Sequence, residues 1–100
     1  MKVSKDFEYT LKDKLYRLCK RERYFTCGTN RQYDRMFAMS IMPEYTYRDI
    51  AVMIFTCSGI PEDEDIGSFF SNIQNQVETI YNDILECEAA VRMEEQQAIM

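Results

Sequence analysis

The C-terminal third of the chain carries a regular apolar stripe, and this stripe constrains the fold more than any other feature. Apolar residues recur there at alternating intervals of four and three positions, at Ile66, Phe70, Ile73, Val77, Ile80, Ile84, Cys87 and Val91. Such alternation places them on one face of a helix, at the a and d positions of a heptad repeat. The stripe predicts one long amphipathic, acidic helix over residues 61–97, with the first six of these residues in its core-facing stripe.

The segment before the stripe predicts where the long helix begins. Pro61 is followed by four consecutive acidic residues, 62–65. Proline fits the first turn of a helix, and carboxylates there face the positive end of the helix dipole. We therefore expect the helix to begin at residue 61.

The stripe needs a partner surface, and the flanking residues argue against a parallel coiled-coil dimer. In such a dimer no flanking pair would join opposite charges, and Asp83 would meet Glu88 of the other copy. Packing against the rest of the chain, or in an antiparallel arrangement, is favoured. A homodimer of another geometry through the long helix stays open.

Three shorter helices are predicted before residue 60. The first covers residues 6–22, whose apolar positions fall on one face: Phe7, Leu11, Leu15, Leu18 and Cys19. Residues 24–27 favour an extended conformation. A capping-box pattern at residues 29–32 then predicts the start of a second helix, and Pro43 predicts its end.

Residues 50–57 are nearly all apolar, so periodicity alone allows either a buried helix or a core strand. Thr46 and Asp49 form a second capping-box pattern directly before this run, and Gly59 follows it. These flanking signals favour a third helix.

Together these elements predict an all-α fold in one domain. A chain of 100 residues with three glycines and two prolines lacks the turns that an all-β fold needs. Residues 1–58 are expected to form a small core of three short helices. The long helix of residues 61–97 is expected to pack against this core or against a second copy.

Charge is distributed very unevenly along the chain. Residues 1–48 contain eleven Lys or Arg and six Asp or Glu, whereas residues 49–100 contain only Arg92 and eleven acidic residues. One interpretation is that the two halves attract each other within the fold. The other is that one of them contacts a partner.

The residue content gives no sign of metal, cofactor or catalytic chemistry. There is no histidine, the four cysteines form no paired spacing, and the three glycines are isolated. We expect no zinc site, no cofactor and no enzyme activity, with cysteines that are reduced and serve as packing residues. The chain shows no secretory signal and no membrane-spanning run, so we expect a cytoplasmic protein.

Candidate partner-binding residues fall into three groups. Acidic positions of the long helix are expected to form a face that fits a basic groove: Glu78, Asp83, Glu86 and Glu88. Tyrosines near Pro43 favour an interface: Tyr45 and Tyr47. Basic positions near the end of the first helix complete the set: Arg17, Arg21 and Arg23.

Nucleic-acid binding is the alternative that these cations suggest. Residues 12–35 are rich in Lys and Arg, with Tyr16, Tyr24 and Phe25 interleaved. Cations with interleaved aromatic rings are typical of surfaces that hold a nucleic-acid backbone and stack on its bases. This alternative is a small nucleic-acid-binding regulator that uses the basic, aromatic segment 12–35.

The stretch KLYRLCKRERYFTCGTNRQYDRMFAM, followed by DIAVMIFTCS, resembles small proteins carried by phages and mobile elements of gut Firmicutes. The resemblance covers roughly residues 12–58 and includes no catalytic motif. In size and charge the chain is similar to anti-CRISPR inhibitors. The resemblance implies a non-catalytic inhibitor that binds a protein partner, a bacterial nucleic-acid-targeting complex of host defence.

Overall fold

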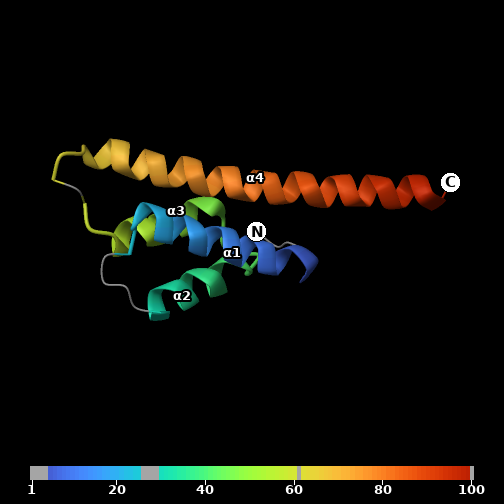
Figure 1. Cartoon of the computed structure of the whole chain (residues 1–100), viewed down its shortest axis with the longest axis horizontal. Coiled ribbons are helices and arrows are strands. Elements are labelled where there is room, and N and C mark those ends of the chain that lie inside the picture. Colours follow the sequence, from blue (N-terminus) through green and yellow to red (C-terminus); the bar gives the residue numbers. More distant parts are fainter. Residues whose placement is uncertain (1–4, 26–29, 61, 100) are drawn as a thin grey trace.

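The structure, a computed structural model, describes residues 5–25, 30–60 and 62–99, and within these ranges it confirms the all-α fold. It contains α1 (Lys5–Glu22), α2 (Asn30–Ser40), α3 (Tyr47–Cys57) and α4 (Ile66–Ile99). Consecutive helices run in opposite directions, and the C-terminal part of α4 extends past the other three (Figure 1). The molecule is therefore an elongated bundle of 58 × 26 × 24 Å.

Four helix pairs approach closely: α1 with α2, α2 with α3, α3 with α4, and α1 with α4. The core lies among them and contains apolar side chains of all four helices and of the segment after α1. From α1 the core takes Leu11, Leu15, Leu18 and Cys19, as the spacing of residues 6–22 predicts. The long helix therefore packs against its own chain.

The buried face of α4 agrees with the predicted stripe in its middle and differs at its start. Ile73, Val77 and Ile84 are buried as predicted. Ile80 packs against the core but is only half-buried, and Phe70 is also half-buried. Ile66 is 57% exposed, so its assignment to the core stripe was wrong.

Two residues outside the predicted stripe complete this face. Phe69 and Tyr81 are buried, although the heptad assignment places them beside the seam. The ring of Phe69 lies 6.0 Å from the rings of both Tyr24 and Phe55, measured between centroids. The Tyr81 hydroxyl donates to the carbonyl oxygen of Ser40 at 3.3 Å. The buried face is thus set by which neighbours α4 meets along its length.

The start of α4 lies later than predicted. Residues 62–64 form turns and a bend, and the helix begins at Ile66. A side-chain oxygen of Asp65 accepts a hydrogen bond from the backbone N–H of Ser68 at 3.3 Å. Asp65 is therefore the N-cap, because an aspartate in this position satisfies an N–H group that the helix itself leaves unpaired.

The segment 47–57 is a helix, which decides between the two interpretations of the apolar run. Thr46 is its N-cap, and the capping box with Asp49 is present. The backbone N–H of Thr46 donates to Asp49 Oδ2 at 2.8 Å, and the N–H of Asp49 donates to Thr46 Oγ1 at 3.4 Å. Ile50, Ala51 and Ile54 face the core. The other predicted capping box depends on Thr29, which lies outside the described residues.

The end of α1 is shaped by an arginine in a left-handed conformation. Arg23 has a φ of 54°, and the N–H of Tyr24 donates to the carbonyl oxygen of Cys19 at 3.1 Å. This bond closes a Schellman-type helix end, where glycine is the usual residue. It turns the chain so that Tyr24 and Phe25 enter the core. Neither residue is in a strand, and the rest of the predicted extended segment, 26–27, lies outside the described residues.

The capping box makes a pH-dependent contribution to stability. The pKa of the Asp49 carboxyl lies below its ordinary value of 3.8, chiefly because the Thr46 backbone N–H donates to it. A carboxyl whose pKa falls on folding stabilises the fold above its unfolded pKa of about 4, and this contribution is lost as the pH falls through the folded pKa. We expect Asp49→Asn to lower the melting temperature at neutral pH, and we expect this difference to shrink as the pH falls below about 4. Thermal unfolding measured over this pH range checks the expectation, and a difference that stays constant would contradict it.

Candidate functional site

The exposed cations of α1 are not paired with the exposed carboxylates of α4 in the described part of the structure. Arg17 and Arg21 form their ion pairs within α1: Arg17 Nε with Asp13 Oδ2 at 3.0 Å, and Arg21 Nε with Glu22 Oε1 at 3.0 Å. The side chains of Arg17 and Arg21 remain 78% and 65% exposed. For these exposed residues, mutual attraction of the two halves therefore does not take the form of ion pairs.

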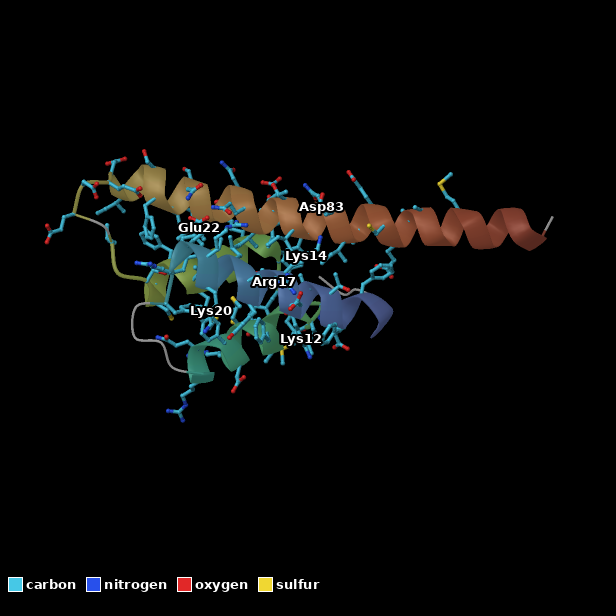
Figure 2. The ribbon with its side chains drawn as sticks, viewed as in Figure 1. Lys12, Lys14, Arg17, Lys20, Glu22 and Asp83 are labelled. Carbon is cyan, nitrogen blue, oxygen red and sulfur yellow. The ribbon has the colours of Figure 1, made fainter. Side chains whose placement is uncertain are left out.

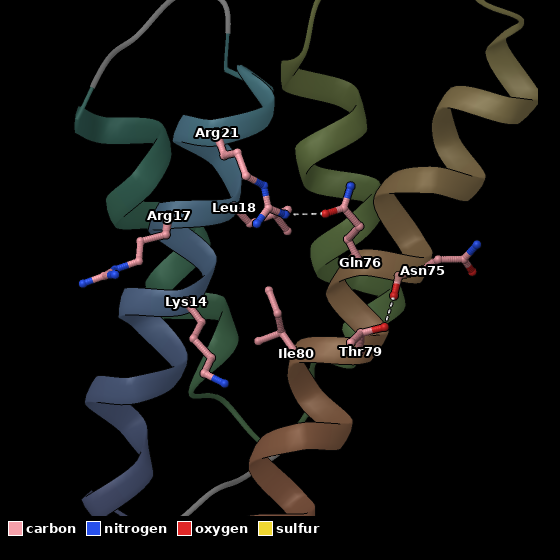
Figure 3. Close-up of a pocket in the computed structure, with 8 residues that line it drawn as sticks. All are labelled: Lys14, Arg17, Leu18, Arg21, Asn75, Gln76, Thr79 and Ile80. Carbon is pink, nitrogen blue, oxygen red and sulfur yellow. Dashed lines mark hydrogen bonds between the residues drawn. The ribbon is translucent and has the colours of Figure 1, made fainter.

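Several basic residues instead border a groove between α1 and α4. The groove has a volume of about 430 Å³ and is lined by Lys14, Arg17, Leu18, Arg21, Asn75, Gln76, Thr79 and Ile80. In Figure 3 Lys14 and Arg21 point toward α4, whereas Arg17 points outward at the rim. Its lining residues include three cations and no carboxylate, and the carboxylates that pair with Arg17 and Arg21 belong to Asp13 and Glu22, outside the lining.

Gln76 holds one of these cations in place. Its Oε1 accepts a hydrogen bond from an Arg21 terminal nitrogen at 2.6 Å (Figure 3). Its Nε2 donates to the Tyr24 hydroxyl at 3.2 Å and to Asn72 Oδ1 at 3.4 Å. Burial is the main cause that raises the pKa of Tyr24 to about 12, so the hydroxyl stays protonated. A buried tyrosine and an amide thus fix the guanidinium beside the groove.

The aromatic residues of segment 12–35 do not form a stacking surface in this groove. Tyr24 and Phe25 are buried, which corrects the prediction that they are interleaved with the cations at a surface. Tyr16 is partly exposed on the flank of α1 that faces α2, where its ring lies 5.1 Å from that of Tyr33. Lys20 Nζ lies 5.3 Å from the centre of the Tyr16 ring. In Figure 2 the labelled cations follow one another along α1.

The predicted acidic face of α4 is smaller than expected. Asp83 and Glu86 are exposed and lie three positions apart, so they are neighbours on one side of the helix. Glu78 is half-buried, and its position five residues before Asp83 places it on a different side. Glu88 is only 8% exposed and has an interaction partner, so its assignment to an exposed face was wrong.

Neither of the two tyrosines near Pro43 lines the groove between α1 and α4. Tyr47 is half-buried and packs against the core. Tyr45 lines a second hollow of about 360 Å³ between α2 and α3, together with Arg35, Met39, Asp49, Val52, Met53, Thr56 and Cys57. Arg23 is exposed beyond the end of α1 and lines neither of these cavities. It lines a third hollow of about 400 Å³, together with Cys19, Lys20, Phe25 and Tyr33. Of the predicted basic residues, the structure therefore brings Arg17 and Arg21 to one site.

The described part of the chain contains no group of three or more His, Cys, Asp or Glu residues placed to hold a metal ion. Cys19, Cys57 and Cys87 are free thiols, and Cys27 lies outside the described residues. Cys19 is buried, but Cys87 is exposed, so the prediction that the cysteines serve as packing residues was wrong for Cys87. Burial raises the pKa of the Cys19 thiol to about 12, and this thiol donates to Met36 Sδ at 3.6 Å. None of the described helices is long and apolar enough to cross a membrane.

Sequence reasoning did not find the α4 side of the groove. Asn75, Gln76 and Thr79 are uncharged, and nothing in their spacing marks them as ligand-binding residues. The one usable signal is that residues 66–77 of an otherwise acidic half contain no carboxylate. Comparison with protein-family models, with curated proteins and with solved structures found no match to this chain. The argument for function therefore depends on the residues themselves.

Proposed function

We propose that this protein is a non-catalytic binding protein that inhibits a bacterial nucleic-acid-targeting complex by docking on it. The observation that carries the proposal is the separation of charge: exposed cations on α1 and exposed carboxylates on α4 make no ion pair with each other in the described structure. Exposed charge of both signs suits a partner that also displays both signs. A complex of protein and nucleic acid is such a partner.

The two charged surfaces lie close enough to act together. Gln76 borders the basic groove, and Asp83 follows it by seven residues, which places both on the same side of α4 about 10 Å apart along the helix. Asp83 and Glu86 can therefore contact a cationic protein groove while the α1 cations approach neighbouring phosphates. The resemblance to anti-CRISPR inhibitors in size and charge supports the same class of partner.

Charge reversal on α4 tests this proposal. We expect Asp83→Lys with Glu86→Lys to abolish inhibition of the target complex, because the new lysines would be repelled by a groove that holds nucleic acid. The melting temperature should hardly change, since both side chains are exposed and no ion pair is lost. The readout is DNA or RNA cleavage by a panel of purified bacterial RNA-guided nucleases, with thermal unfolding measured alongside.

The matched control reverses the same amount of charge elsewhere. Glu62→Lys with Glu64→Lys lies in the exposed turns before α4, away from Asp83 and Glu86. This control should inhibit as the wild type does. Equal loss of inhibition in both double variants would indicate a non-specific charge effect. Failure of the wild-type protein to bind or inhibit any complex in the panel would contradict the proposed function.

A small nucleic-acid-binding regulator is the second candidate, and the basic α1–α4 groove favours it. A regulator binds its own operator alone, with a specific dissociation constant of about 10⁻⁸–10⁻¹¹ M. An inhibitor does not need to bind any particular DNA sequence. A competition assay on the isolated protein with operator-containing and random duplex DNA distinguishes the two candidates. Only a regulator should stay bound to the operator DNA when random duplex DNA is added in excess.

A further inference from the structure

We propose that the groove between α1 and α4 binds the sugar-phosphate backbone of a nucleic-acid strand, without reading its bases. The inference names the ligand of one part of the docking surface and rests on the proposal that the partner contains nucleic acid. It assigns a role to Lys14, one of the cations of the basic segment 12–35, and a positioning role to Gln76. The argument uses the chemistry of the lining, the fixed position of Arg21 and the place of the aromatic residues.

The charged groups of the lining are all hydrogen-bond donors. Lysine and arginine side chains donate and do not accept, and phosphodiester oxygens accept and do not donate. Lys14 points into the groove, and no carboxylate of the described residues lies within ion-pair distance of it. Arg17 and Arg21 each use Nε for an ion pair, and a guanidinium has five N–H donors in all. Donors thus remain available along the groove.

The cations form a track along one side of α1. Lys14, Arg17 and Arg21 are spaced three and four residues apart, so they follow one another over about 10 Å of helix. Gln76 holds the Arg21 guanidinium through a 2.6 Å hydrogen bond before any ligand arrives. Fixing a side chain in advance reduces the entropy that binding must remove. A strand lying along the groove would meet Lys14 and Arg21 inside it and Arg17 at its rim.

The groove has no surface on which bases can stack. Tyr24 and Phe25 are buried in the core, and Tyr16 packs toward α2 on the other flank of α1. Sequence-tolerant strand binding normally combines cations with such rings. Binding here therefore depends on phosphate contacts alone, which makes it weak, indifferent to sequence and strongly dependent on salt.

An acidic peptide fits the same groove less well. Peptides that dock on proteins usually add to a sheet edge or insert apolar side chains into pockets. The groove is bordered by two helices, whose backbone groups are paired within each helix. Two of its lining residues have wholly apolar side chains, Leu18, which is buried, and Ile80, which is half-buried. A backbone of regularly spaced phosphates needs neither feature.

The test measures how binding of a labelled single-stranded oligouridylate to the isolated protein depends on salt. If the strand makes three phosphate contacts, a plot of the logarithm of the association constant against the logarithm of salt concentration should have a slope of about −2 for a single strand. Lys14→Gln with Arg21→Gln removes two of these contacts and should reduce the slope to about −0.7. Its affinity at low salt should fall at least about tenfold. An oligothymidylate of the same length should bind as the oligouridylate does.

A matched control removes the same charge outside the groove. Lys12→Gln with Arg31→Gln changes two cations that do not line it, and this variant should keep the wild-type slope. Lys14→Gln alone breaks no ion pair of the described residues, so it tests the slope even if the double variant does not fold. For this single variant we expect a slope smaller in magnitude by about 0.7.

Three outcomes would overturn the proposal: no oligouridylate binding at low salt, equal slopes for the groove variant and its control, or equally strong competition by polyglutamate. The last would identify the site as one for acidic peptides. Each is distinguishable from failure of the proposed function, which is read from nuclease inhibition. If the protein inhibits a nuclease but does not bind the oligonucleotide, the proposal that the groove binds nucleic acid fails, and the proposal that the protein is an inhibitor stands.

Discussion

Replacement of Val77 by aspartate is expected to unfold the protein. Val77 is fully buried in the middle of α4 and belongs to the core that all four helices share. An aspartate there places an unpaired carboxylate in an apolar environment, or forces it to bind a proton. A domain of this size has a total stability of about 5–15 kcal/mol, and the cost of an unpaired buried charge is comparable. Ile73→Asp should have the same effect, because Ile73 is equally buried.

The matched control uses the same helix and the same chemistry. Ile66→Asp places the carboxylate at a side chain that is 57% exposed, so it should leave the fold intact. Circular dichroism and thermal unfolding of the three variants check the expectation. A cooperative transition near the wild-type temperature in Val77→Asp would show that the buried face of α4 is wrongly placed. Unfolding of Ile66→Asp would restore the heptad assignment that begins at this residue.

Truncation of Tyr81 to alanine is expected to cost about 3–5 kcal/mol of unfolding free energy, the range for large aromatic residues in a core. Its ring is buried beside the end of α2, and its hydroxyl donates to the carbonyl oxygen of Ser40. Burial is the main cause that raises the pKa of Tyr81 to about 12, so the hydroxyl keeps its proton as a donor. The residue therefore contributes both packing and one buried hydrogen bond. Urea denaturation measures the loss.

A second variant separates these two contributions. Tyr81→Phe keeps the ring and removes only the hydroxyl, which leaves the Ser40 carbonyl without this donor and should cost about 1 kcal/mol. The alanine variant should therefore be clearly the less stable of the two. Equal losses in the phenylalanine and alanine variants would mean that the hydrogen bond, and not the packing of the ring, attaches α4 to the end of α2.

Features that depend on a few neighbouring residues were predictable from the sequence. The capping box of Thr46 and Asp49 is one, because both of its hydrogen bonds join residues three positions apart. The same pair of residues predicted a helix for residues 50–57, whereas the apolar composition of this run allowed either a helix or a strand. The start of α4 was less accessible. Proline and acidic residues suit a first helical turn in general, so the pattern placed the start of the helix at residue 61. The helix begins later because Asp65, the last of the four acidic residues, is its N-cap.

The buried face of α4 was predictable only in part, because a heptad repeat assumes that the helix packs against a single partner helix along its whole length. Each step of four residues rotates the position by about 40° around the helix. From Phe69 to Tyr81 the buried residues take three such steps, and the buried face drifts accordingly. Phe69 meets Tyr24 and Phe55, whereas Tyr81 meets Ser40. Information about these neighbours is not present in the local sequence of α4.

The groove was not predictable for a related reason. Its cations were visible as a basic segment, but their function as a site depends on Gln76 and its neighbours, which lie more than fifty residues away. Sequence patterns also do not show that Tyr24 and Phe25 turn into the core after Arg23. This turn buries two of the aromatic rings that the composition of residues 12–35 had suggested for a surface.

The order in which the helices contact one another has a consequence for folding kinetics. Three of the four close helix pairs join consecutive helices, and the pair of α1 with α4 joins the two ends of the described chain. Contacts between consecutive helices close short loops and form early, whereas the Arg21–Gln76 contact must close a separation of 55 positions. An intermediate built from α2 and α3 would have no groove. A ligand of the groove therefore binds only the fully closed chain, and its presence should slow unfolding and leave early folding unaffected.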